Sequence, residues 1–266
     1  MAVLLGAAAI ASCGETRGTL VTTPVTTDAD AGTWRPTTST SWQVQLSGSL
    51  DASMDVALYE IDSFATTARQ LATLRAEGRR VVCYISVGTF EPWRDDAGAF
   101  PDAAVGSALP NYPDERWLDS RDATVRALMI ARLQVARQDG CDGVDLSNVS
   151  PGTADTGFGL LRTDVLAYAR FLAAQAHQRG LVVGLGGSSD VAETLQPDFD
   201  WATTDSCLPS GTCAAFAAFT GAGKAVLGVE FGTEGDAAEI CPRARQANLN
   251  AIIKNRSLDA FRVACP

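Results

Sequence analysis

The sequence contains a single histidine, His177, among its 266 residues. A Ser-His-Asp triad would have only this side chain as its base, and a metal site built from several histidines is excluded. His177 falls near the end of an amphipathic segment, where a cation interacts favourably with the helix dipole. Acid–base chemistry in this protein must therefore depend on its 31 Asp and Glu residues.

Positive charge is also scarce, since 21 Lys and Arg residues leave a net charge of −10. Nucleic acids and anionic membrane surfaces attract basic proteins, so neither is an expected partner. The acidity promotes solubility, and it also favours a cationic ligand such as an amino sugar polymer. No apolar run reaches the roughly 18 residues that span a bilayer, so we expect no transmembrane helix.

Motifs for nucleotides and metals are missing as well. Residues 184–189 read GLGGSS after a strand-like run, yet they fit neither GxGxxG nor GxxxxGK[ST]. The cysteine spacings do not resemble a zinc site. We therefore expect no metal and no organic cofactor.

The N-terminal segment indicates export. A short apolar run over residues 4–10 leads into Ile-Ala-Ser-Cys at 10–13, which matches a bacterial lipobox. We expect a signal peptide over residues 1–12 and lipid attachment at Cys13, giving an envelope lipoprotein or a secreted protein. A plain signal peptide with a chance cysteine is the alternative.

The segment that follows, residues 13–41, is rich in Thr and almost without apolar periodicity. Such a segment buries too little surface to offset its ordering entropy, which predicts a disordered tether. The remaining residues, 42–266, are expected to form a single domain and a monomer.

Seven cysteines are present. Because an exported protein permits disulfides, we expect two of them. Cys207 with Cys213 and Cys241 with Cys265 are the expected pairs. Cys83 and Cys141 lie in or near strand-like runs and are expected to be buried thiols.

Strand-like and helical segments alternate along the domain. Eight apolar runs are strand-like: 42–46, 56–62, 81–86, 143–148, 182–187, 201–206, 225–231 and 251–255. Helical spacing recurs over 65–77, 122–138 and 163–179, with Thr163 as the expected N-cap of the last. Repeated strand–helix units predict an α/β fold with a parallel sheet, and eight of them a (β/α)8 TIM barrel. A doubly wound open sheet is the alternative.

Carboxylates recur at the ends of these runs. Asp62, Asp145, Asp205 and Glu230 lie at or near the ends of four of them. A parallel barrel brings such ends around one mouth, where crowded carboxylates push their pKa values apart and supply one acid and one base. Two carboxyls about 5–5.5 Å apart suit a retaining glycosidase, and about 6.5–9.5 Å an inverting one.

Aromatic residues also fall on strands and on the long connection at 87–120, which is expected to cross the mouth. Sugar rings stack on aromatic faces, so these residues suit a carbohydrate site. They are Trp42, Tyr84, Trp93, Trp117 and Trp201. Trp93, beside charged residues in a loop, is the best candidate platform.

The chain resembles glycoside hydrolase family 114, the endo-α-1,4-polygalactosaminidase family of (β/α)8 barrels. The matching segments are WQVQLSG at 42–48, YEID at 59–62, CYISVG at 83–88, EPWR at 91–94, WLD at 117–119 with Arg121, DGV at 142–144, NV at 148–149, and Cys207 with Cys213. The resemblance covers about residues 42–265.

Three strand ends depart from the family pattern. Glu-Pro-Asp-Asn of the fourth strand is Asp145-Leu146-Ser147-Asn148 here, so Ser147 replaces an acid. Lys-Asn of the fifth is Gly186-Gly187, and Glu of the sixth is Asp205. The family uses one acid from the fourth strand and one from the sixth.

The resemblance implies a hydrolase that cleaves an α-linked galactosamine-containing exopolysaccharide. We expect Asp145 and Asp205 as the catalytic carboxylates. The residues expected to bind substrate are Asp62, Tyr84, Trp93, Arg94, Asn148 and Glu230. A catalytically impaired polysaccharide-binding lipoprotein on the same barrel is the alternative, and a surface protein without a sugar site is a third possibility.

Overall fold

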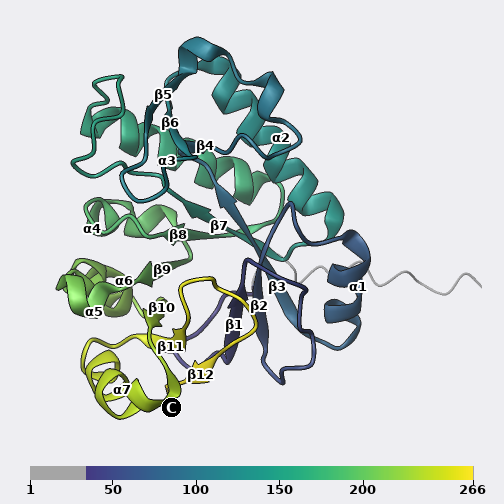
Figure 1. Ribbon diagram of the computed structural model, residues 1–266, viewed down its shortest axis with the longest axis vertical. Coiled ribbons are helices and arrows are strands. Elements are labelled where there is room, and N and C mark those ends of the chain that lie inside the picture. The colour runs from purple at the N-terminus through teal and green to yellow at the C-terminus, as the bar shows by residue number, and fades with distance from the viewer. Residues whose placement is uncertain (1–33, 266) are drawn as a thin grey trace, which may run out of the picture.

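The computed structural model describes residues 34–265, which form a barrel of eight parallel strands. Figure 1 shows how the strands and helices are arranged. The strands are β1 (Trp42–Gln45), β2 (Leu58–Asp62), β3 (Arg80–Ser86), β7 (Gly143–Ser147), β8 (Val182–Gly186), β9 (Trp201–Asp205), β10 (Val226–Phe231) and β11 (Asn250–Lys254). They pair in this order, and β12 (Val263–Ala264) adds an antiparallel strand beside β11. The expected signal peptide, Cys13 and most of the expected tether lie outside the described residues.

All eight expected strands are confirmed, and helices follow most of them. The helices are α1 (Ala68–Ala76), α2 (Ala123–Asp139), α3 (Arg162–Gln178), α4 (Ala192–Leu195), α5 (Cys207–Ser210), α6 (Ala217–Gly221) and α7 (Ala237–Gln246). Within residues 34–265, none is long and apolar enough to cross a membrane.

Local signals set the helix ends. Thr67 and Gln70 form a capping box at the start of α1, and Asp122 accepts hydrogen bonds from two backbone N–H groups of the first turn of α2. The prediction that Thr163 is the N-cap of α3 is wrong, because Leu161 occupies that position. Helix α3 begins one residue earlier, and Asp164 Oδ2 accepts a bond from the N–H of Leu161 at 3.0 Å. A carboxylate in the first turn thus fulfils the capping role.

The seam between β1 and β11 is closed by side chains. Lys254 Nζ donates to Gln43 Oε1 at 3.0 Å, and Gln43 Nε2 donates to the Ala260 carbonyl at 3.0 Å. Trp42 Nε1 donates to the Asn250 carbonyl at 3.2 Å. The two ends of the parallel sheet therefore meet, and the open-sheet alternative is excluded.

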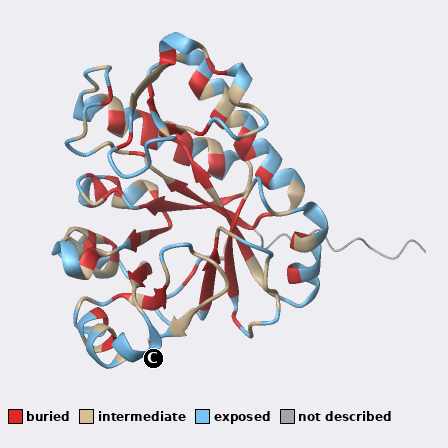
Figure 2. Ribbon diagram, in the orientation of Figure 1, coloured by how far each residue is buried: buried red, intermediate tan, exposed pale blue. Residues whose placement is uncertain are grey.

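Most residues of the barrel strands are buried (Figure 2), and most of their apolar side chains belong to two clusters. The larger cluster lies between strands and helices, and the smaller one fills the barrel interior around Trp42 and Trp201. A Cβ at Gly184 would lie 2.3 Å from Trp201 Cε2. Gly184 therefore leaves the space that the indole of Trp201 occupies.

Three disulfides tie the chain together. Cys207–Cys213 and Cys241–Cys265 form as expected. The expectation of free thiols at Cys83 and Cys141 is wrong, because these residues form the third bond. Strands β3 and β7 are neighbours, so residues 58 apart in sequence come to a Cα–Cα distance of 5.9 Å. Sequence separation hid this contact.

Residues 34–41 correct the expected boundary of the tether. Arg35 Nε donates to Asp200 Oδ1 at 2.6 Å, and the guanidinium of Arg80 lies over the Trp34 ring at 5.6 Å. These residues therefore pack on the barrel, and the folded domain begins before residue 42.

Candidate functional site

A cavity of about 370 Å³ opens at the carboxyl ends of the strands. Seven strands or the residues directly after them contribute to its lining: β1, β2, β3, β7, β8, β9 and β10. This end of a parallel barrel is where active sites are found, because the connecting loops converge there.

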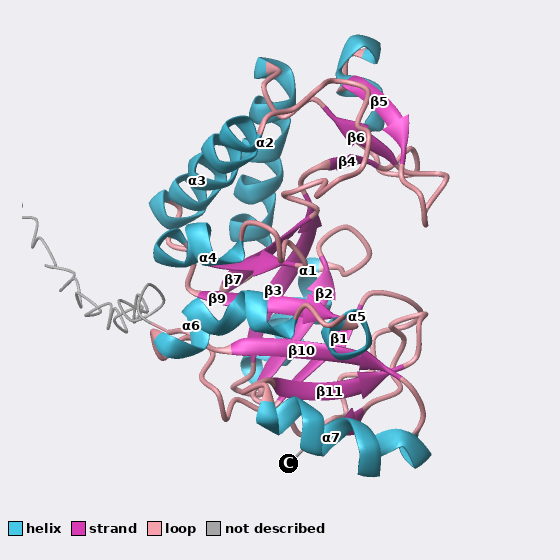
Figure 3. Cartoon of the chain, turned by 90° about the vertical axis from the view of Figure 1, so that its left-hand side faces the viewer, coloured by secondary structure: helices cyan, strands magenta, loops and turns pink. Residues whose placement is uncertain are grey.

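The long connection after β3 supplies one wall. It contains β4 (Thr89–Phe90), β5 (Val105–Ala108) and β6 (Arg116–Leu118), which form a small antiparallel sheet. Figure 3 shows this sheet at the end of the molecule opposite α7. Tyr112 and Glu115, from the turn between β5 and β6, line the cavity. The expectation that this connection reaches the mouth is confirmed.

Asp145 lies in β7 and lines the cavity. Its side chain is fully buried, and neither carboxylate oxygen has a hydrogen-bond partner among the described residues. Burial without a counter-charge disfavours the ionised form. It raises the pKa of Asp145 from its ordinary 3.8 to about 6.

Glu60 in β2 is a carboxylate that the sequence analysis missed. It is 3% exposed and lines the same cavity, and its Oε2 has no partner among the described residues. Burial, and then the charge of Asp145, raise the pKa of Glu60 well above its usual range. Strand parity could have found it, because Glu60 shares a face with Asp62 two residues later.

Asp205 ends β9 on another side of the cavity. Its side chain reaches solvent at the mouth, although partial burial by the walls still raises its pKa. The next residue, Ser206, has a left-handed backbone with φ of 52°, and its N–H donates to the Val229 carbonyl at 2.9 Å. This turn fixes the direction in which the strand end presents Asp205.

Space beside Asp145 depends on Gly186. A Cβ there would lie 2.5 Å from Asp145 Oδ1 and 2.3 Å from Ser147 Oγ. Any side chain at position 186 would therefore displace Asp145 or Ser147. Gly186 and Ser147, which both depart from the family pattern, are therefore neighbours in the site, and a side chain at position 186 would collide with the Ser147 hydroxyl.

Tyr84 and Asn148 are found where they were expected, in the cavity lining. Burial, and then the charges of nearby carboxylates, raise the pKa of Tyr84 above its usual range. Asn148 Nδ2 donates to Ser86 Oγ at 2.9 Å, and the Asn148 backbone has a φ of 58°. Both side chains can therefore present polar atoms to a ligand.

Asp62 and Arg94 lie outside this lining and bind each other. Arg94 donates to both oxygens of Asp62 at 2.9 Å and to Glu91 at 2.7 and 2.9 Å. Asp62 instead lines a second cavity of about 280 Å³. Trp93 is 55% exposed and lies outside both linings. None of these three residues thus lines the cavity that contains Asp145.

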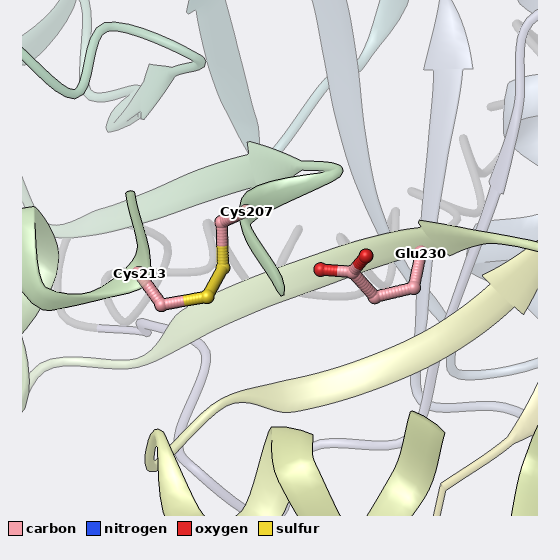
Figure 4. Close-up of side chains that lie close together, drawn as sticks. All are labelled: Cys207, Cys213 and Glu230. Carbon is pink, nitrogen blue, oxygen red and sulfur yellow. A yellow bond between two sulfur atoms is a disulfide. The ribbon is translucent and has the colours of Figure 1, made fainter. Parts of the chain in front are cut away.

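Glu230 lies in β10 beside the Cys207–Cys213 disulfide (Figure 4). The ligand atoms of these three residues lie within 4.8 Å of one another. Because the sulfurs are bonded together, they are not the thiolates that bind metals. Glu230 Oε1 instead accepts the Leu208 N–H at 3.1 Å, and burial raises the pKa of Glu230. It supports the loop after Asp205.

A (β/α)8 barrel with a carboxylate-lined mouth defines the class of protein. The model of glycoside-hydrolase family GH114 matches residues 23–266, and the chain belongs to this family. No curated protein matches the chain.

Solved structures similar to the chain include two glycoside hydrolases. Ega3 of Aspergillus fumigatus, solved in complex with galactosamine, is 33% identical with a TM-score of 0.83. That match covers 88% of this chain and 98% of Ega3. The glycoside hydrolase domain of PelA from Pseudomonas aeruginosa is 13% identical with a TM-score of 0.67, covering 84% of this chain and 98% of that domain. The likeness to PelA concerns the fold alone.

Proposed function

We propose that this chain hydrolyses an α-linked galactosamine-containing exopolysaccharide by carboxylate acid–base chemistry. Family membership and the similarity to a structure that contains galactosamine support a glycoside hydrolase acting on such polymers. The single observation that carries the chemistry is that Asp145 and Asp205 line one cavity at the barrel mouth.

The charge of the lining supports a cationic substrate. Four carboxylates line the cavity, at Glu60, Glu115, Asp145 and Asp205, whereas Arg256 is the one Lys or Arg in the lining. Galactosamine carries an amino group that is cationic when protonated, so a chain of such sugars is attracted to an acidic mouth. An N-acetylated polymer would lack this attraction.

The environments of the two proposed catalytic carboxyls suit different roles. Asp145, with a pKa of about 6, retains a proton to a higher pH than an exposed Asp and is the proposed acid. Asp205 reaches solvent at the strand end and is the proposed nucleophile or base. In either case the acid protonates the glycosidic oxygen while the second carboxylate, or a water that it activates, attacks the anomeric carbon.

A polysaccharide-binding module without activity is the second candidate. It is favoured by the burial of both Asp145 oxygens and by the serine at position 147. Tyr84, Asn148 and Tyr112 would still offer contacts to a sugar in such a module.

The test is incubation of the purified domain with de-N-acetylated galactosaminogalactan and measurement of released reducing ends. A hydrolase releases them, and Asp205→Asn lowers the rate by about 1000-fold, the range seen when a catalytic group is removed. Asp102→Asn, at an exposed position outside the cavity, is the matched control and leaves the rate unchanged. Polymer binding without release supports the inactive module, and neither binding nor release rejects both candidates.

We also propose that the mature protein is anchored through a lipid on Cys13. The motif at residues 10–13 supports this location. Cys13→Ser should move the protein from the membrane fraction to the soluble fraction. Unchanged partitioning would reject the anchor and leave the proposed hydrolase activity untouched.

A further inference from the structure

Glu60 and Asp145 share an unusual environment. Both side chains are buried, and three of their carboxyl oxygens, Glu60 Oε2 and both of Asp145, have no hydrogen-bond partner among the described residues. Buried polar atoms are ordinarily satisfied, because an unpaired buried charge is costly. Two such residues in one cavity require a common explanation.

The topology places both side chains on the inner face of adjacent strands. Strand β3 lies between β2 and β7, and its Tyr84 is in register with Asp62 on one side and Asp145 on the other. Glu60 precedes Asp62 by two residues and therefore points to the same face. Glu60, Tyr84 and Asp145 all line the cavity. The two carboxyls thus lie in one buried, polar space around Tyr84.

Two ionised carboxylates in this space would repel each other without compensation. Among the lining residues the cation is Arg256, whose guanidinium lies 5.0 Å from the Phe231 ring centroid. Carboxylates that share a site cannot both ionise cheaply, so one of them retains a proton. A proton on either carboxyl would also supply an O–H donor in a space where three carboxyl oxygens have none among the described residues.

Other titratable groups face this space from every side. They are Tyr84 on β3, Asp205 on β9, Tyr112 and Glu115 on the long connection, and Arg256 after β11. Glu115 already accepts a hydrogen bond from Thr89 Oγ1 at 2.8 Å, and Asp205 reaches solvent. These two carboxylates have other partners or water to stabilise their charge, whereas Glu60 and Asp145 are buried without a cationic partner in the described part of the chain, although the Thr203 hydroxyl partly offsets the raised pKa of Asp145.

We propose that Glu60 and Asp145 share one proton at neutral pH, and that Glu60 is a positioning residue of the reaction that keeps Asp145 supplied with that proton. The reaction in this statement is the proposed hydrolysis, on which the role of Glu60 rests. The shared proton itself belongs to the free protein and requires no substrate.

Infrared spectroscopy of the free protein tests the shared proton. Ordinary carboxyls are ionised at pH 7, so a protonated carboxyl gives a separate carbonyl band. We expect this band in the wild-type domain at pH 7, and expect ¹³C labelling of Asp or of Glu side chains each to shift part of it. Absence of the band, or a shift with neither label, would overturn the proposal without use of any variant.

Variants locate the proton. Glu60→Gln and Asp145→Asn remove the like charge and place an amide donor beside the remaining carboxylate, so each should lower the pH at which the band disappears by about one unit or more. Glu60→Asp retains a carboxyl and should retain the band. Glu115→Gln, on the same cavity, is the matched control and should leave it unchanged. A band that persists unaltered in both amide variants would contradict the assignment.

The rate profile tests the role of Glu60. If Asp145 must be protonated to act, activity is lost as the pH rises, and Glu60→Gln should move this alkaline limb about one unit lower. Above that limb the rate should fall about tenfold, while the KM for the polymer changes little. An unmoved limb would refute the role. If the wild-type domain releases no reducing ends, the proposed function fails, and the infrared result still decides the shared proton.

Discussion

The two ends of the barrel treat carboxylates in opposite ways. At the amino ends of the strands, Asp200 accepts bonds from Arg35, His177 and the Val183 N–H at 2.6 to 2.9 Å. At the carboxyl ends, Asp145 is more deeply buried and has no bonding partner among the described residues. An aspartate carboxylate thus stabilises the fold at the amino ends of the strands, whereas one at the carboxyl ends remains available to a substrate.

The contrast is also visible at the two ends of a single strand. Asp142, directly before β7, accepts bonds from Arg80 at 3.0 Å and from the Val81 N–H at 2.9 Å. Asp145 follows three residues later. The pKa values of Asp200 and Asp145 differ accordingly. Burial tends to raise the pKa of Asp200, but hydrogen bonds from His177 and Arg35 outweigh it and lower the pKa to about 2. Burial raises the pKa of Asp145 to about 6.

The largest expected effect is at the mouth. Asp145→Asn should lower the hydrolysis rate by about 1000-fold, as expected when a catalytic acid is removed. The same change should raise the free energy of unfolding at pH 7 by about 1–3 kcal/mol, because it removes a buried unpaired charge. Reducing-end release and urea unfolding measure the two effects.

The pH dependence of this gain has a defined sign. Asp145 has a raised pKa in the folded state, so its favourable contribution is complete below its ordinary value of 3.8 and is lost as the pH rises through about 6. The stability advantage of Asp145→Asn should therefore shrink as the pH falls from 7 to 4. An advantage that does not change over this range would contradict the raised pKa of Asp145.

The opposite change is expected at the base. Asp200→Asn should lower the free energy of unfolding at pH 7 by about 1–2 kcal/mol, because charge-assisted bonds are lost at a site that solvent partly screens. The specific rate of folded protein should be unaffected. Asp200 has a lowered pKa, so its contribution is present above 3.8 and is lost as the pH falls through about 2. Urea unfolding at pH 7 and pH 3 measures the stability loss and its pH dependence. A reduced specific rate of the folded variant would contradict the assignment of a purely structural role to Asp200.

The smallest expected effect concerns an aromatic residue at the rim. Tyr112 is 63% exposed and lines the cavity, so it is available to stack on a sugar ring. Tyr112→Ala should raise the KM for the polymer by roughly 3- to 10-fold, in line with a stacking contact of about 1 kcal/mol. The melting temperature should hardly change. Trp93→Ala, exposed but outside the cavity, is the control and should leave the KM unaltered.

The sequence predicted the barrel well, because its parallel strands are nearly continuous apolar runs. The small sheet of β4, β5 and β6 was not predicted, since its strands are two to four residues long and lie in a polar segment. Their pairing depends on contacts within the long connection. Nothing in local periodicity reports such contacts.

The lining of the cavity was predicted in part. Asp145, Asp205, Tyr84 and Asn148 follow from strand ends and line the cavity as expected. Arg94 was expected to bind substrate, yet it is committed to Asp62 and Glu91 by geometry that no single segment reveals. Glu60 was not predicted, because the prediction took carboxylates at or near strand ends and Glu60 lies two residues before the end of β2. Depth along the barrel axis, rather than order in the sequence, decides which carboxyl faces the cavity.

The seam held by Gln43 and Lys254 has a consequence for how the chain is made. The first strand finds its last neighbour only when Lys254, 211 residues after Gln43, has been synthesised. Until then the nascent chain exposes the apolar edge beside Trp42, and domains generally fold as units once complete. Ribosome-bound intermediates should thus remain open to proteases and chaperones until the segment that contains Lys254 has emerged.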